Sequence, residues 1–106
     1  MATNVVKDQT KEAFVTAMHM AIRKGSVDEV TALLNVIDDP NATDDEGYTA
    51  LHEAAKRNLA DIVTLLINRG ADVEAPTKEG RTPLAVALLA GNVDIANQLV
   101  TAGATQ

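Results

Sequence analysis

Apolar residues recur along the chain at helical spacing, in stretches that come in pairs. Between Lys11 and Lys24 the apolar positions lie mostly three or four residues apart, which predicts an amphipathic helix. A second apolar stretch follows Gly25 and ends near Ile37, and it predicts a shorter partner helix. The same order of helix, helix and polar turn then occurs twice more. The pattern therefore predicts an all-α protein made of three helix–turn–helix units.

Residues that start and stop helices divide the units. Thr49 and Thr82 stand where N-caps are expected, and Pro83 occupies the first helical position, where its missing N–H costs nothing. Asn58 and Gly70 are expected to end the two helices of the second unit. The polar connections between units are expected to project as turns.

The units repeat at a fixed period. The segment 47–54 matches 80–87, with Gly, Thr, Leu and Ala in the same columns, and a weaker copy carries Thr16, His19 and Gly25. The offset between the copies is 33 residues, from Gly47 to Gly80. A constant offset of this length indicates a stacked array, in which each unit buries its apolar face only against its neighbours. Such arrays are mostly scaffolds for binding rather than enzymes.

The repeated residues resemble a known family. The segments 49–52 (Thr-Ala-Leu-His), 61–66 (Asp-Ile-Val-Thr-Leu-Leu) and 70–73 (Gly-Ala-Asp-Val) are similar to the ankyrin repeat. The resemblance implies an ankyrin-repeat solenoid with β-turn fingers and a concave, non-catalytic face that binds another protein. It divides the chain into a flexible N-terminus over 1–10 and an ankyrin repeat domain over 11–106, with repeats at about 11–43, 44–76 and 77–106.

The first and last units depart from the family pattern. Phe14 and Val15 stand where a finger would carry glycine and a variable residue, so the first helix is expected to extend as an N-terminal cap. In the third unit Asn97 and Gln98 replace Thr64 and Leu65, which predicts a polar outer side and a complete array.

Composition narrows the classes of partner. The 106 residues carry a net charge of −6, which disfavours a nucleic-acid backbone as the partner. The chain has no cysteine, so it has neither disulfides nor thiolate metal ligands. It shows no signal peptide and no stretch long enough to span a membrane, so a cytoplasmic location is expected.

Candidate catalytic and metal-binding residues fail in detail. His19 and His52 share one column, and in ankyrin repeats a histidine there ties neighbouring turns together through hydrogen bonds. The acidic run 38–46 lacks the glycine and glutamate that a calcium-binding EF-hand loop requires. Asn41 begins a formal glycosylation sequence, which we interpret as a coincidence of the turn. We therefore expect no catalytic residue, no cofactor and no metal.

The candidate contact face combines finger residues with the ends of the first helix in each unit. Four cations align there, Arg23, Lys24, Lys56 and Arg57, and could hold an acidic partner segment. Alternatively they complement the helix dipoles or pair with the finger carboxylates. Leu88 and Leu89 replace Ala55 and Lys56 and predict an apolar patch, for partner docking or weak self-association of a mainly monomeric protein. The predicted contact residues are Arg23, Lys24, Asp45, Glu46, Tyr48, Glu53, Lys56, Arg57, Lys78, Glu79, Arg81, Val86 and Leu89. A small inhibitor or effector that occludes an enzyme and an engineered scaffold remain open as alternatives, although the irregular first repeat speaks against strict consensus design.

Overall fold

The computed structural model describes residues 2–105 of the chain, with side chains from residue 11 onward. The described residues contain helices and turns but no strand, which confirms the all-α prediction. The helices are α1 (Ala2–Lys24), α2 (Val27–Val36), α3 (Ala50–Lys56), α4 (Ala60–Asn68), α5 (Pro83–Leu89) and α6 (Val93–Thr101).

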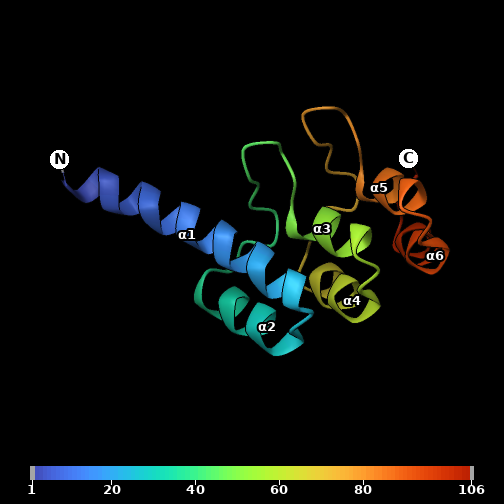
Figure 1. Cartoon of the computed structure of the whole chain (residues 1–106), viewed down its shortest axis with the longest axis horizontal. Helices are drawn as coiled ribbons and strands as arrows, with labels where there is room; N and C mark the ends of the chain where they lie inside the picture. Colours follow the sequence, from blue (N-terminus) through green and yellow to red (C-terminus); the bar gives the residue numbers. More distant parts are fainter. Residues whose placement is uncertain (1, 106) are drawn as a thin grey trace.

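The helices form three pairs that stack side by side. In each pair the two helices pack together, and α3 packs between α1 and α5 while α4 packs between α2 and α6. Two long loops, the first finger (residues 38–49) and the second finger (residues 70–82), project beyond the stack in the same direction (Figure 1). We call the surface formed by α1, α3, α5 and the two fingers the inner face, and the row α2, α4 and α6 the outer row.

The helix boundaries follow the signals in the sequence. Thr49 and Thr82 accept hydrogen bonds from the backbone N–H three residues later, at 3.3 and 3.2 Å, so both are N-caps as predicted. Asn58, two residues after the end of α3, has a left-handed backbone (φ 63°), so the helix does not continue there. The helices α3 and α4 begin one repeat period before α5 and α6.

The first repeat departs from this plan as expected, and by more than expected. Phe14 and Val15 lie buried within one continuous helix, so this stretch is helical where the later repeats have a finger. That helix begins at Ala2 rather than near Lys11. The flexibility predicted for 1–10 falls on residues whose side chains lie outside the described part. At the C-terminal end of α2, Ile37 stands where the second repeat has Gly70. Without a glycine there, the chain leaves the helix through an extended backbone at Ile37 (φ −127°, ψ 104°).

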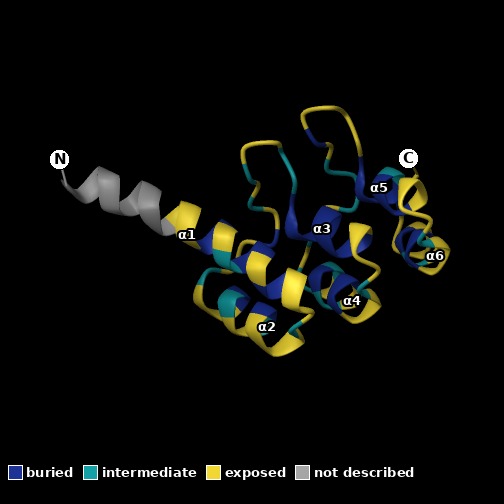
Figure 2. Ribbon diagram, in the orientation of Figure 1, coloured by how far each residue is buried: buried dark blue, intermediate teal, exposed yellow. Residues whose placement is uncertain are grey.

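The core lies between the two rows of helices. Figure 2 shows the buried residues on the surfaces where the helices face each other. Small side chains such as Ala54, Ala55 and Ala87 are fully buried and let neighbouring helices approach closely. The largest fully buried apolar side chains are Ile22, Leu34, Leu51, Ile62, Leu66, Ile95 and Leu99.

The two fingers have the same hydrogen-bond pattern and touch each other. In the first, the Gly47 N–H donates to the Asp44 carbonyl at 3.0 Å, which closes a β-turn, and residues 77 and 80 repeat this at 2.8 Å. The Lys78 N–H donates to the Glu46 carbonyl of the first finger at 3.0 Å. The fingers therefore hold each other in register.

The two polar residues predicted on the outer side of the third repeat differ in exposure. Asn97 is exposed, but Gln98 is half-buried and points toward α4, where its amide donates to Thr64 Oγ1 and to the Ala60 carbonyl at 3.3 Å. The Gln98 amide therefore bridges the last two repeats, in addition to adding polarity to the outer side.

Candidate protein-binding face

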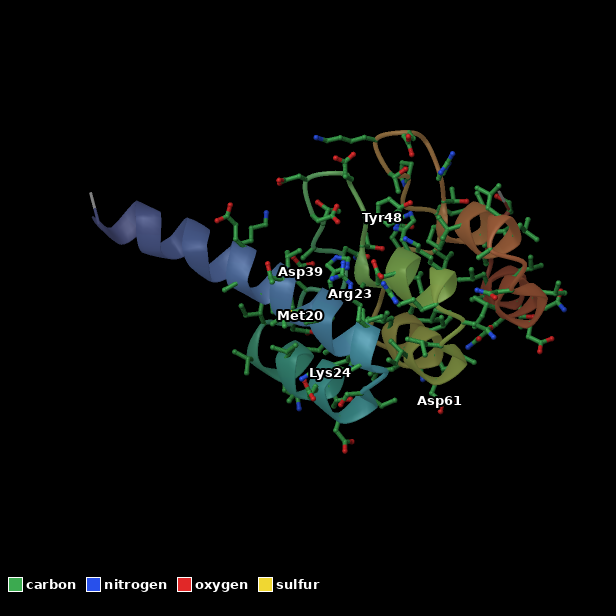
Figure 3. All side chains as sticks on the ribbon, in the orientation of Figure 1. Met20, Arg23, Lys24, Asp39, Tyr48 and Asp61 are labelled. Carbon is green, nitrogen blue, oxygen red and sulfur yellow. The ribbon has the colours of Figure 1, made fainter. Side chains whose placement is uncertain are left out.

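Residues of the second and third repeats line an open groove of about 210 Å³ on the inner face. Five of its six lining residues belong to the predicted contact set. The lining consists of Tyr48 and Arg81 from the fingers, and Lys56, Val86, Leu89 and Ala90 from α3, α5 and its C-terminal end. In Figure 3, Tyr48 lies on the side of the molecule from which the fingers project. Sequence reasoning missed only Ala90, the neighbour of Leu89.

The groove positions are equivalent in successive repeats. Tyr48 and Arg81 lie one repeat period apart, at the same place in their fingers. Lys56 and Leu89 are separated by the same period and stand at the last position of their helices. Stacked repeats place equivalent positions side by side. The finger position therefore supplies the Tyr48 ring and the Arg81 guanidinium, and the helix-end position supplies the Lys56 ammonium and the Leu89 side chain.

His52 fixes the finger residues of this groove. Its Nδ1 accepts the Thr49 backbone N–H at 3.1 Å, so Nε2 carries the hydrogen and donates to the Arg81 carbonyl at 2.9 Å. The Tyr48 ring packs against it, with ring centroids 5.4 Å apart. Burial lowers the pKa of His52 below 6.5, which favours the neutral imidazole that this arrangement needs. The structural role predicted for this histidine is confirmed.

The four predicted cations do not form one free stripe, because Glu53 lies among them. The Arg57 guanidinium donates through Nε to Glu53 Oε2, and Arg23 Nε lies 4.0 Å from the same oxygen. His19 Nδ1 lies 3.4 Å from the other oxygen, Oε1. The adjacent His19 and the Arg57 guanidinium lower the pKa of Glu53 to about 2 despite its burial. Part of the positive charge is therefore neutralised within the protein.

Three other cations of the predicted contact set, Lys24, Arg81 and Lys56, do not pair with Asp45 or Glu46. Lys24 Nζ lies 3.4 Å from Glu29 of α2. Arg81 pairs with Glu79 of its own finger at 3.6 Å. Within the described residues, no carboxylate forms an ion pair with Lys56. The suggested pairing of helix-end cations with Asp45 and Glu46 is therefore absent from this part of the chain.

The family of the chain follows from a comparison with family models. The model for ankyrin repeats matches residues 18–106, in three copies. The chain belongs to the ankyrin repeat family. The comparison with curated proteins found no match.

Ankyrin repeats generally mediate protein–protein interaction, and the family is typically non-enzymatic. The family match begins at Met18, within α1, where the first repeat departs from the common pattern. The match covers both repeats that form the groove.

The structure distributes the other predicted contact residues of this ankyrin domain between the surface and the interior. The finger residues Asp45, Glu46, Lys78 and Glu79 are exposed. In contrast, Glu53 is 6% exposed and Val86 is 5% exposed, so they have little surface for direct contact with a partner. Glu53 orients neighbouring cations instead, and Val86 forms the floor of the groove.

A second hollow of about 550 Å³ lies beside α1 and the first finger and was not anticipated from the sequence. Its lining is mostly polar: Lys11, Glu12, Val15, Thr16, Thr43, Asp44 and Asp45. The first repeat has no finger, so the first finger of the molecule faces the side of a long helix here. Comparing equivalent positions in the three repeats could not reveal this hollow, since it has no equivalent in the other repeats.

Neither metal-binding nor membrane-spanning features occur in the described residues of the ankyrin domain. No group of three or more His, Asp or Glu side chains there could hold a metal ion. No described helix is both long and apolar enough to cross a membrane. At the formal glycosylation sequence, Asn41 accepts the Asp72 N–H at 2.7 Å and donates to the Gly70 carbonyl at 3.4 Å, so its amide connects two repeats.

Proposed function

We propose that this ankyrin repeat protein binds a partner protein through its inner face, without catalysis. The observation that carries the proposal is the groove, where predicted contact residues from two repeats come together. Leu89, which lines the groove, is 70% exposed and stands next to Leu88, which is 59% exposed, so two adjacent leucines face solvent there. The fingers are held by mutual hydrogen bonds, so little of this face needs to be ordered on binding.

Affinity capture from the native source tests this proposal. The bait variant Lys56→Glu/Leu89→Glu changes the inner face, and Arg69→Glu/Val93→Glu makes the same kind of charge and polarity change on the outer row, at the C-cap of α4 and in α6. Leu89 and Val93 are both exposed, so neither replacement disturbs the core. We expect the wild type and the control pair to retain the same proteins, and the inner-face pair to lose them. Identical retention by all three baits would contradict the proposal.

An inhibitor that occludes an enzyme would use the same face. If the captured protein is an enzyme, its activity with and without this chain distinguishes inhibition from scaffolding. A monomeric state and a cytoplasmic location complete the proposal, and fractionation of cells from the native source tests the location.

A further inference from the structure

We infer that the groove binds a partner segment in which an acidic side chain lies next to an aliphatic one. The carboxylate would lie between Lys56 and Arg81, and the aliphatic side chain would pack against Leu89 above Val86. This inference rests on the proposed function and specifies the partner's chemistry. It differs from the four-cation stripe predicted from the sequence, because Lys56 and Arg81, rather than Arg23, Lys24 and Arg57, would supply the positive charge.

Both groove cations have charge available for a partner. Lys56 is exposed and has no ion-pair partner among the described carboxylates. Among the described carboxylates Arg81 pairs with Glu79, at 3.6 Å, and their side chains are 48% and 66% exposed, so solvent weakens this pair and a partner carboxylate can displace it. Arg57, in contrast, is committed to the nearly buried Glu53.

The apolar part of the groove lies directly beside these charges. Leu89 is exposed, Val86 is buried beneath it, and Ala90 adds a small side chain at the end of α5. Tyr48 supplies a half-buried aromatic ring on the opposite finger, held by its contact with His52. Rings held in this way are typical anchors of protein interfaces. A purely acidic peptide would leave this apolar wall exposed to water.

The charges on the rest of the molecule favour the groove as the place where an acidic partner binds. Asp28, Asp61 and Asp94 are exposed at equivalent positions in the first turns of α2, α4 and α6. Figure 3 shows Asp61 beside the outer row, away from Tyr48 and the fingers. With a net charge of −6, most of the surface repels an acidic segment, and the groove is a local exception.

Selection from a phage-displayed library of random peptides tests the inference. Enriched peptides are synthesised, and their affinities are measured at low and high salt. The groove variants are Lys56→Gln/Arg81→Gln and Leu89→Ser. The matched controls are Lys11→Gln/Lys24→Gln, which removes the same charge elsewhere, and Val93→Ser, which changes an exposed aliphatic side chain of α6 that does not line the groove.

We expect enriched peptides to combine Asp or Glu with Leu, Ile or Val. The charge pair of groove substitutions should weaken binding roughly tenfold, as expected for two partly exposed contacts, and should flatten the salt dependence. Leu89→Ser should weaken binding at both salt concentrations, and the controls should keep wild-type affinity.

Three results would overturn the inference. Peptides that are basic, or no enriched peptides at all, would exclude the proposed chemistry. Acidic peptides whose affinity depends on Lys24 rather than on Lys56 and Arg81 would place binding elsewhere on the inner face, and the proposed function would stand. Wild-type protein that dimerises under the assay conditions, with NMR shifts at Lys56 and Arg81 on dilution, would make a second copy the occupant. The capture experiment tests the proposed function separately.

Discussion

Glu53 shows how one residue changes the role of its neighbours. Its equivalent in the third repeat is Val86, so the same column holds a buried carboxylate in one layer and a buried aliphatic side chain in the next. The carboxylate needs cations for its burial, and it obtains them from Arg23 of α1 and from Arg57 at the end of α3. Where valine replaces it, the neighbouring surface is free to be apolar, as Leu89 is.

The low pKa of Glu53 predicts acid sensitivity. In the unfolded chain its pKa is 4.5 and in the folded protein about 2, so between these values the unfolded state binds more protons. Stability from Glu53 is therefore present above pH 4.5 and is lost as the pH falls toward 2. Glu53→Gln should lower the free energy of unfolding by about 1–3 kcal/mol at neutral pH. Its difference from wild type in urea titrations should shrink below pH 4.5.

Glu29→Gln is the control, because Glu29 forms an exposed ion pair with Lys24. Its effect should stay within about 1 kcal/mol. A constant difference between wild type and Glu53→Gln across this pH range would contradict the assigned role of Glu53.

Gly47 and Gly80 separate two reasons for glycine at equivalent positions. Both have φ 82°, but a Cβ at Gly47 would lie 2.9 Å from the Lys78 nitrogen, whereas nothing lies within 4 Å of one at Gly80. Gly80→Ala should therefore cost only the left-handed backbone, about 1–2 kcal/mol. Gly47→Ala should cost more, since it also disturbs the hydrogen bond between the fingers. Equal losses in chemical denaturation would show that the close approach relaxes freely.

At the scale of elements, each helix pair depends on its neighbours for a buried face. The helix α4 packs between α2 and α6, and α3 between α1 and α5. The fingers are joined by a backbone hydrogen bond, by the Asn41 amide and by the His52 ring. Loss of packing in the central repeat therefore affects both sides of the stack.

Leu66→Ala tests this dependence. Leu66 is fully buried in α4, and large-to-small changes in cores cost about 2–5 kcal/mol. We expect a single unfolding transition at lower denaturant, because the central repeat supports both neighbours. Val36→Ala is the control, since Val36 is 80% exposed at the end of α2, and it should change stability little. A separate transition for one repeat would show that the layers unfold independently.

At the scale of the whole molecule, the apolar surface is dispersed. Leu88 (59% exposed) and Leu89 form an adjacent pair, and Val93 and Val100 are exposed on α6. Stable interfaces bury roughly 1,200–2,000 Å² in total, far more than two leucines provide. The predicted patch therefore favours contact with a larger partner over a tight dimer.

Sedimentation equilibrium tests this expectation. The protein should be a monomer at micromolar concentration, with any self-association restricted to much higher concentration and reduced by Leu88→Ser. A dimer at micromolar concentration that survives this substitution would contradict it and would require another interface.

The amino-acid sequence by itself determined the helical units, their caps and the repeat family. These features depend on local spacing and on residues such as Thr49, Thr82 and Asn58, whose effects act within one turn. The repeat period also places equivalent columns side by side, which is why the sequence alone identifies Tyr48, Lys56, Arg81 and Leu89 as neighbours on one face.

The tertiary structure decided which of these side chains are free. A column comparison cannot tell that Glu53 turns inward to His19 and Arg57, or that Gln98 bridges to α4. It also cannot show that residues without equivalents, such as Lys11 and Thr43, line a second hollow. Ion pairing and burial depend on distances between helices, and each layer varies these through its own side chains. The sequence therefore located the candidate binding face, and the packing left the charges of Lys56 and Arg81 accessible in its groove.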